Sequence, residues 1–219
     1  MVKVWSEDDP KAGLMARKRE AIVEAALKAF LDSGYAESSV NRIAADAGVS
    51  IKTLYRHFEN KDDLFSAVME AACSRPDDEA DAARGPSGEP SWYSKAPRTG
   101  LPLAGREYLR HLLSEEQLAL YRVVVRDAHR FPELGRRYQE QVSGQQDALF
   151  AGYLDRWIPS TGWKVANKRA AARVFAGLLK AGLFDEVLHG GRKPHKDEIA
   201  TQAREAAERM LTLLENGRL

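Results

Sequence analysis

The chain has 219 residues, of which 44% are hydrophobic and 30% are charged, and its formal net charge is +1. This length provides one or two domains with a buried core, and the small net charge excludes a uniformly basic protein that binds nucleic acid non-specifically. The single cysteine, Cys73, excludes an internal disulfide and a cysteine metal cluster, so we interpret it as a packing residue in a reducing compartment.

The amino-terminal part of the chain predicts short helices. The first, about Arg17 to Ser33, has apolar residues at three- and four-residue spacing, and Gly34 is placed to end it. Ser38 or Ser39 can cap a second helix that ends before Gly48. No stretch alternates apolar and polar residues for long enough to predict a strand, so we expect an all-α fold.

Two further short helices complete this predicted bundle. Ser50 can cap a helix that runs to Phe58, and Asn60 can cap one from Lys61 to about Arg75. From residue 76 to residue 105, five prolines are interleaved with glycine, serine and charge, which predicts a flexible segment.

The remainder of the chain predicts a larger helical bundle, which brings the total to about nine helices. The breaks in its periodicity fall at serine, proline and glycine residues. The predicted helices cover about 106–113, 115–130, 133–157, 165–189 and 196–216.

The helix from Ser50 to Phe58 has two different faces. At about 100° per residue, Leu54 and Phe58 fall together and are expected to face the core. The opposite face is polar and cationic, as is typical of a helix that contacts base edges and phosphates in the major groove. The predicted DNA-binding residues on the second and third helices and at the start of the fourth are Ser39, Asn41, Arg42, Ser50, Ile51, Lys52, Thr53, Tyr55, Arg56, His57 and Lys61.

These residues have different expected roles. Lys61 and the polar residues of the second helix suit phosphate contacts, and Arg56 suits a guanine. Ile51 suits a thymine methyl group, although it could equally pack inward. An ordinary helical hairpin with solvated lysine and arginine side chains is the alternative to a DNA-binding motif.

The run from Ser38 to Phe65, SSVNRIAADAGVSIKTLYRHFENKDDLF, resembles the amino-terminal domain of the tetracycline-repressor (TetR) family. The resemblance extends over about Met15 to Glu70. It implies a helix-turn-helix domain, over residues 1–61 and ordered from about residue 15, that binds double-stranded DNA. It also implies that residues 62–219 bind an effector and form a homodimer. A dimer predicts a roughly palindromic operator.

The stretch from Leu118 to Leu134 resembles the carboxyl-terminal domain of the AefR-like branch of this family. An effector in such a domain is expected to be small and apolar or amphipathic. The apolar and aromatic residues that could surround it are explained equally well by core packing. The candidate effector-binding residues are Leu112, Tyr121, Val124, Phe150, Tyr153, Trp157 and Phe175.

The last two predicted helices, 165–189 and 196–216, can cover the core and also meet their symmetry mates in a dimer. His111, Asp127 and His129 form no defined metal motif, so we expect no metal and no cofactor. The sequence lacks a glycine-rich phosphate loop, a zinc motif and a nucleophile elbow, which disfavours the alternative of an enzyme.

No apolar run approaches the roughly 18 residues of a membrane span, and the polar start, Met1 to Pro10, does not resemble a signal peptide. We therefore expect a cytoplasmic, ligand-responsive repressor that a small-molecule effector releases from its operator.

Overall fold

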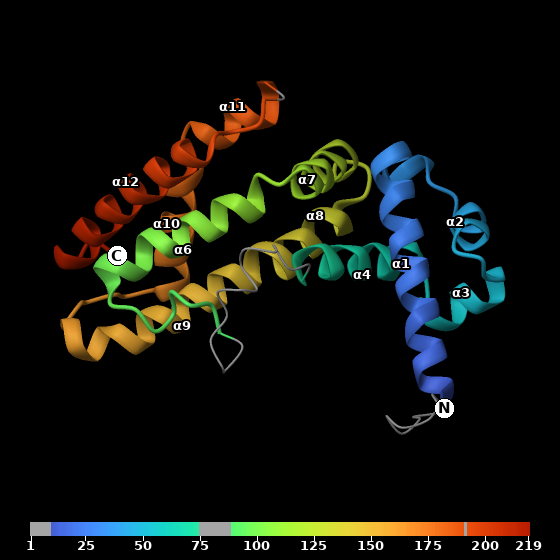
Figure 1. The fold of residues 1–219 in the computed structure, drawn as a ribbon, viewed down its shortest axis with the longest axis horizontal. Helices are drawn as coiled ribbons and strands as arrows, with labels where there is room; N and C mark the ends of the chain where they lie inside the picture. Colours follow the sequence, from blue (N-terminus) through green and yellow to red (C-terminus); the bar gives the residue numbers. More distant parts are fainter. Residues whose placement is uncertain (1–9, 75–88, 191) are drawn as a thin grey trace. The chain divides into compact units, whose positions relative to one another are not determined.

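A computed structural model describes residues 10–74, 89–190 and 192–219 of the chain (Figure 1). These residues form helices joined by turns and loops, without a sheet, which confirms the all-α prediction. They belong to two compact units. The first contains residues 1–74 and 119–142, and the second contains residues 75–118 and 143–219.

Four helices form the amino-terminal part of the first unit: α1 (Pro10–Glu37), α2 (Val40–Asp46), α3 (Ile51–His57) and α4 (Lys61–Ser74). Helix α1 contacts each of the other three (Figure 1). The core between them consists of apolar side chains that are fully buried, among them Ile22, Phe30, Ile43, Leu54 and Phe65. Burial of these side chains is the main stabilisation that helices as short as α2 and α3 can gain.

Gly34 breaks α1 as the sequence predicts. Its φ is 81°, a left-handed conformation that only glycine adopts readily, and the helical stretch beyond it ends at Glu37. The predicted side-chain hydrogen bond that caps α2 is absent. Ser39 has the extended backbone of a cap residue but no capping side-chain bond, and the hydroxyl of Ser38 donates to the Tyr35 carbonyl instead.

The first unit also contains most of α7 (Glu115–Asp127) and the helix α8 (Pro132–Tyr138). Helix α8 packs on α4. A helix predicted to run continuously over 133–157 is thus three elements, because a π-helical turn, Gln139–Ser143, separates α8 from α9 (Gly144–Thr161). Val142 continues the four-residue spacing of Leu134 and Tyr138 into this turn, so periodicity alone did not reveal it.

The second unit contains α6 (Pro97–Leu112), α9, α10 (Lys168–Lys180), α11 (Leu183–Gly190) and α12 (Lys196–Glu215). Helices α6 and α12 lie side by side over much of their length, and α10 packs against α9 and α12 (Figure 1). The single helix predicted over 165–189 is divided in two by Gly182, whose φ is 83°. The prediction for 196–216 is confirmed to within one residue by α12.

Helix α6 begins at Pro97, nine residues earlier than predicted, so the flexible segment expected up to residue 105 is wrong over 97–105. Proline is tolerated in the first turn of a helix, because the N–H it lacks would have no partner there. A Cβ on Gly100 would lie 2.8 Å from the Lys95 carbonyl and 3.0 Å from that of Trp92, so glycine permits this close approach. Residues 89–96 of the predicted segment form a turn in which Trp92 is buried, whereas residues 76–88 and the side chain of Cys73 lie outside the described part of the chain.

Candidate nucleic-acid interface

The turn between α2 and α3 fixes the direction of α3. Gly48 has a φ of 66°, and the Val49 amide donates to the Ala44 carbonyl at 2.9 Å. The Ser50 hydroxyl accepts from the Thr53 amide at 3.1 Å, which caps α3 as predicted. Asn60 caps α4 in the same way by accepting from the Asp63 amide at 2.9 Å.

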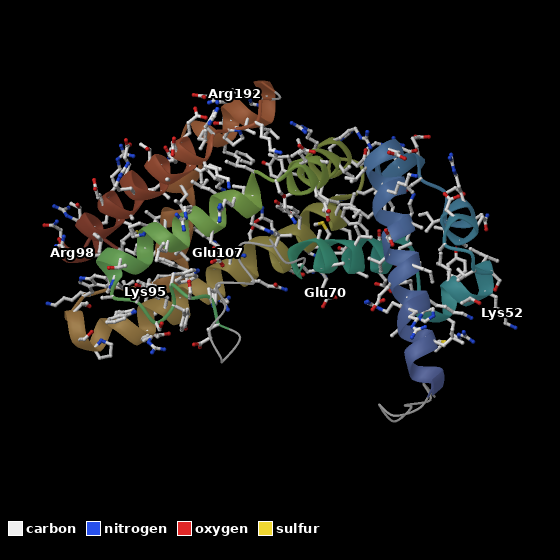
Figure 2. All side chains as sticks on the ribbon, in the orientation of Figure 1. Lys52, Glu70, Lys95, Arg98, Glu107 and Arg192 are labelled. Atoms are coloured by element: carbon white, nitrogen blue, oxygen red, sulfur yellow. The ribbon has the colours of Figure 1, made fainter. Side chains whose placement is uncertain are left out.

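The two faces of α3 are those that the sequence predicts. Leu54 is 0% exposed and Phe58 is 4% exposed, whereas Tyr55 is 52% exposed. Ile51 is 37% exposed, so of its two predicted orientations the structure favours the outward one. Figure 2 shows Lys52 projecting from α3 away from the helices that form its core.

Most of the predicted DNA-binding side chains are exposed to solvent, and they come from α3 and from the start of α2. The exposed ones are Ser39, Asn41, Arg42, Ser50, Ile51, Lys52, Tyr55 and Arg56, and the partly buried ones are Thr53, His57 and Lys61. Five of them line a shallow hollow on the surface of α3: Ser50, Lys52, Thr53, Tyr55 and Arg56. Two cationic side chains and three side chains with hydroxyl groups therefore line the same hollow.

Two of the predicted cations have oxygen partners within the protein. Arg42 lies 3.8 Å from Asp46, in an exposed pair that contributes little to stability. The Lys61 ammonium donates to the Ser38 carbonyl at 2.6 Å and lies 4.6 Å from the centroid of the Tyr35 ring. Burial lowers the pKa of Lys61. Lys61 therefore holds the end of α1 in place, a role that its position in the sequence did not indicate.

His57 lies at the edge of the exposed face of α3. Its Nε2 atom is buried without a hydrogen-bond partner in the structure. Burial lowers the pKa of His57, and the nearby charges of Arg56, Arg19 and Lys18 lower it further. His57 is therefore mainly neutral near pH 7.

Asp127, at the end of α7, anchors the segment that follows Gly34. Its buried carboxylate accepts from the amide of Tyr35 at 2.8 Å and from that of Ala36 at 3.3 Å. Arg126 lies 3.3 Å from the same carboxylate. Burial opposes the charge on Asp127, but the hydrogen bonds from Arg126 and the two amides outweigh it and lower the pKa. The sequence around Asp127 suggests at most a metal ligand and gives no sign of this role.

Arg137 of α8 makes a second connection within this unit. Its guanidinium lies 3.3 Å from Asp63 of α4 and 2.8 Å from Glu133, and it donates to the hydroxyl of Ser66. Residues from the carboxyl-terminal half of the chain thus hold both ends of the helix-turn-helix segment, at the end of α1 and at the start of α4.

The seven predicted effector-binding residues are divided between the two units. Tyr121 and Val124 belong to the first unit, where Tyr121 packs edge-on against Tyr138. The other five belong to the second unit, and four of them form an aromatic cluster around Tyr153 together with two residues that the sequence analysis missed. The cluster consists of Trp92, Tyr93, Phe150, Tyr153, Trp157 and Phe175.

Hydrogen bonding differs among the members of this aromatic cluster. The Tyr153 hydroxyl donates to the Lys95 carbonyl at 2.9 Å, and Tyr153 is fully buried. The indole N–H groups of Trp92 and Trp157 are buried without a partner in the structure. Trp92 and Tyr93 lie in the segment that was expected to be flexible, so they were not considered as candidates.

Among the described residues, no group of three or more histidine, cysteine, aspartate and glutamate side chains is arranged to hold a metal ion. None of the helices in the same residues is long and apolar enough to cross a membrane.

Two family models match the chain. The model for bacterial regulatory proteins of the tetR family matches residues 22–68, and the model for the carboxyl-terminal domain of AefR-like transcriptional repressors matches residues 99–213. The HTH-type transcriptional repressor BepR of Brucella suis is 43% identical over 54 residues, which are 25% of this chain and 26% of BepR. The chain therefore spans only about a quarter of the length of the curated relatives it matches.

Solved structures are similar over nearly the whole chain. A crystal structure of a TetR-family regulator from Mesorhizobium loti has a TM-score of 0.74 and 28% identity, covering 91% of this chain and 97% of the other. FadR from Bacillus subtilis, solved in complex with stearoyl-CoA, has a TM-score of 0.63 and 20% identity, covering 90% and 98%. The second of these likenesses concerns the fold alone.

The anchoring role of Asp127 leads to a pH-dependent prediction. Because its folded-state pKa is lowered, the charged carboxylate stabilises the fold above its unfolded pKa of about 4, and this stabilisation is lost as the pH falls. We expect Asp127→Asn to reduce the free energy of unfolding by about 1–3 kcal/mol near pH 7, with a smaller difference from the parent near pH 3, below the unfolded pKa, where the folded carboxylate begins to be protonated. Urea unfolding at the two pH values measures this.

Asp46→Asn is the control, because Asp46 is exposed and its ion pair with Arg42 is long. It should change the unfolding free energy by less than about 0.5 kcal/mol. An equal loss for Asp127→Asn at both pH values would show that the charge of Asp127 is not what stabilises the segment after Gly34.

Proposed function

The chain belongs to the TetR family of bacterial transcriptional regulators, and we propose that it is a repressor that a small-molecule effector releases from its operator. The observation that carries this proposal is the exposed polar and cationic face of α3, which lies opposite the buried Leu54. In this proposal residues 1–61 bind DNA, and residues 62–219 bind the effector and form a homodimer. The protein acts by binding, without catalysis, in the cytoplasm.

We propose that α3 enters the major groove of the operator. Lys52 neutralises a phosphate, and Arg56 donates two hydrogen bonds to a guanine edge. The outward position of Ile51 suits contact with a thymine methyl group. Two copies related by a twofold axis then bind two half-sites, so the operator is roughly palindromic.

Selection of duplexes from a random pool with the purified full-length protein tests this proposal. We expect Lys52→Ala to weaken binding to all duplexes and to lower the salt dependence, because a phosphate contact releases counterions whatever the sequence. We expect Arg56→Ala to relax the preference at one base pair of each half-site, at a cost of about 1–3 kcal/mol. Titrations of both variants at several salt concentrations measure the difference.

Lys28→Ala is the control for these variants, since Lys28 is exposed on α1 and lies outside the proposed interface. If Lys52→Ala and Arg56→Ala bind like Lys28→Ala, the exposed face of α3 is not the DNA-binding face. If the parent protein selects no sequence at all, the proposed function is wrong.

We propose that the homodimer forms through the helices at 165–189 and 196–216, which include α10, α11 and α12. One face of α10 supports this, because Val174 is 37% exposed although it is a large apolar residue. Ala170 and Gly177 are exposed on the same face, and small residues there allow a second helix to approach closely. A symmetric pair of such faces buries the valine of each copy.

We expect Val174→Asp to convert the dimer to a monomer, because it places a carboxylate without a partner in a buried apolar contact. Size-exclusion chromatography with light scattering measures the molar mass. Val125→Asp is the matched control, since Val125 is 60% exposed on α7 and belongs to the other unit. A dimer that survives Val174→Asp and dissociates with Val125→Asp would place the interface elsewhere.

We propose that the effector binds at the aromatic cluster around Tyr153 and is apolar or amphipathic. The complex of FadR with stearoyl-CoA supports an amphipathic ligand in a protein of this fold. Among the described residues, the indole N–H groups of Trp92 and Trp157 have no hydrogen-bond partner, which supports a ligand that carries a hydrogen-bond acceptor. Such a ligand must bind the conformation that cannot bind DNA more tightly than the DNA-binding conformation, by about 5.5 kcal/mol, to lower the DNA-binding fraction of the protein from 99% to 1%.

Native mass spectrometry of protein purified from its expression host tests this part. We expect a bound small molecule with an oxygen or nitrogen acceptor, and we expect Trp157→Phe to reduce its occupancy by about fivefold, because one donor is lost. Trp163→Phe, in the loop that follows α9, is the control. Equal occupancy in the two variants would contradict a role for the Trp157 indole N–H.

A further inference from the structure

The amino-terminal turns of α1 form a surface that the helix-turn-helix motif does not account for. The match to the amino-terminal family model begins at residue 22, whereas α1 begins at Pro10. Figure 1 shows these turns of α1 continuing past the level of α3 within the same unit. Their side chains are described from residue 13 onward.

Two contacts join these turns to the carboxyl-terminal end of α3. The guanidinium of Arg56 lies 3.3 Å from the sulfur of Met15. The guanidinium of Arg19 lies over the ring of Phe58, 5.4 Å from its centroid. Arg56 is one of the side chains that line the hollow on α3. The start of α1 and the exposed face of α3 are therefore parts of one continuous surface.

The side of α1 that faces α3 is positively charged. At about 100° per residue, Lys18 and Arg19 share the side of the buried Ile22, and the exposed Glu20 and Glu24 point to the opposite side. Within the described residues, no carboxylate is paired with Lys18 or Arg19. The charges of both residues reach His57, where they disfavour its protonation.

We infer that Lys18 and Arg19 form a second phosphate-binding element, which contacts the DNA backbone beside the bases that α3 reads. The inference rests on the proposed function and extends its interface beyond the residues of the family motif. A DNA duplex carries one negative charge per about 1.7 Å of its axis, so a cation pair adjoining the recognition helix meets phosphates that α3 does not reach. These contacts add affinity and fix orientation without reading sequence.

The double variant Lys18→Gln/Arg19→Gln tests the inference, with the duplex selected from the random pool as the probe. Two lost phosphate contacts should reduce the slope of log K against log salt by about 2 × 0.9 and weaken binding about tenfold near physiological salt. The selected sequence should stay the same. The matched control is Arg17→Gln/Lys28→Gln, which removes the same charge from the opposite side of α1 and should change the slope much less.

Arg19 also packs on Phe58, so two further variants separate charge from packing. Lys18 contacts no core ring, so Lys18→Gln alone should reduce the slope of log K against log salt by about 0.9. Arg19→Lys keeps the positive charge and should leave this slope unchanged. If the double variant and its control have the same slope, or if Lys18→Gln leaves the slope unchanged, the inference is overturned while the proposed function stands. If the parent binds no duplex with sequence preference, the proposed function falls first.

Discussion

The burial of Leu54 and Phe58 against α1 is the constraint on which the arrangement of the first unit depends. A helix of seven residues gains too little from its own hydrogen bonds to be stable alone, so α3 exists because its apolar side is buried. That burial leaves only one face of α3 free, and the residues on it other than Ile51 are polar or cationic. The same packing that stabilises α3 therefore decides which side chains can reach a ligand.

The ends of this short motif are held by residues that lie far away in the sequence. Asp127 accepts from two amides just after Gly34, and Arg137 reaches Asp63 at the start of α4. A change in the position of α7 or α8 therefore acts on both ends of the helix-turn-helix segment. Under the proposed function, an effector that prefers one arrangement of α7 and α8 would thereby change the position of the proposed DNA-binding helix α3.

Local chemistry made much of this predictable from sequence. Gly34, Gly48, Ser50 and Asn60 act through their own backbone conformation or through an amide three residues away, so their roles follow from spacing. The roles of Lys61 and Asp127 depend on partners brought together by the fold, and spacing gives no sign of them.

The misplaced helix ends have a common physical cause. Proline and glycine were interpreted as loop residues over 97–105, but proline also suits a first helical turn, and Gly100 is needed for close packing. At Gly182 the apolar pattern continues through a break in the helix, and at the π-helical turn the hydrogen bonding changes while the flanking backbone stays helical. Hydrophobic periodicity reports which side of a segment is buried and does not report where its hydrogen bonding changes.

The net charge of +1 is consistent with DNA binding because the charges are separated in space. On α1, Lys18 and Arg19 face α3 while Glu20 and Glu24 face away, so opposite charges that cancel in a count do not cancel at the surface. With a Debye length of about 8 Å at physiological salt, a phosphate at this surface responds mainly to the cations next to it. The positive surface is therefore formed by the exposed face of α3 and the adjoining side of α1. Neither the composition nor the helix-turn-helix motif alone indicates this surface.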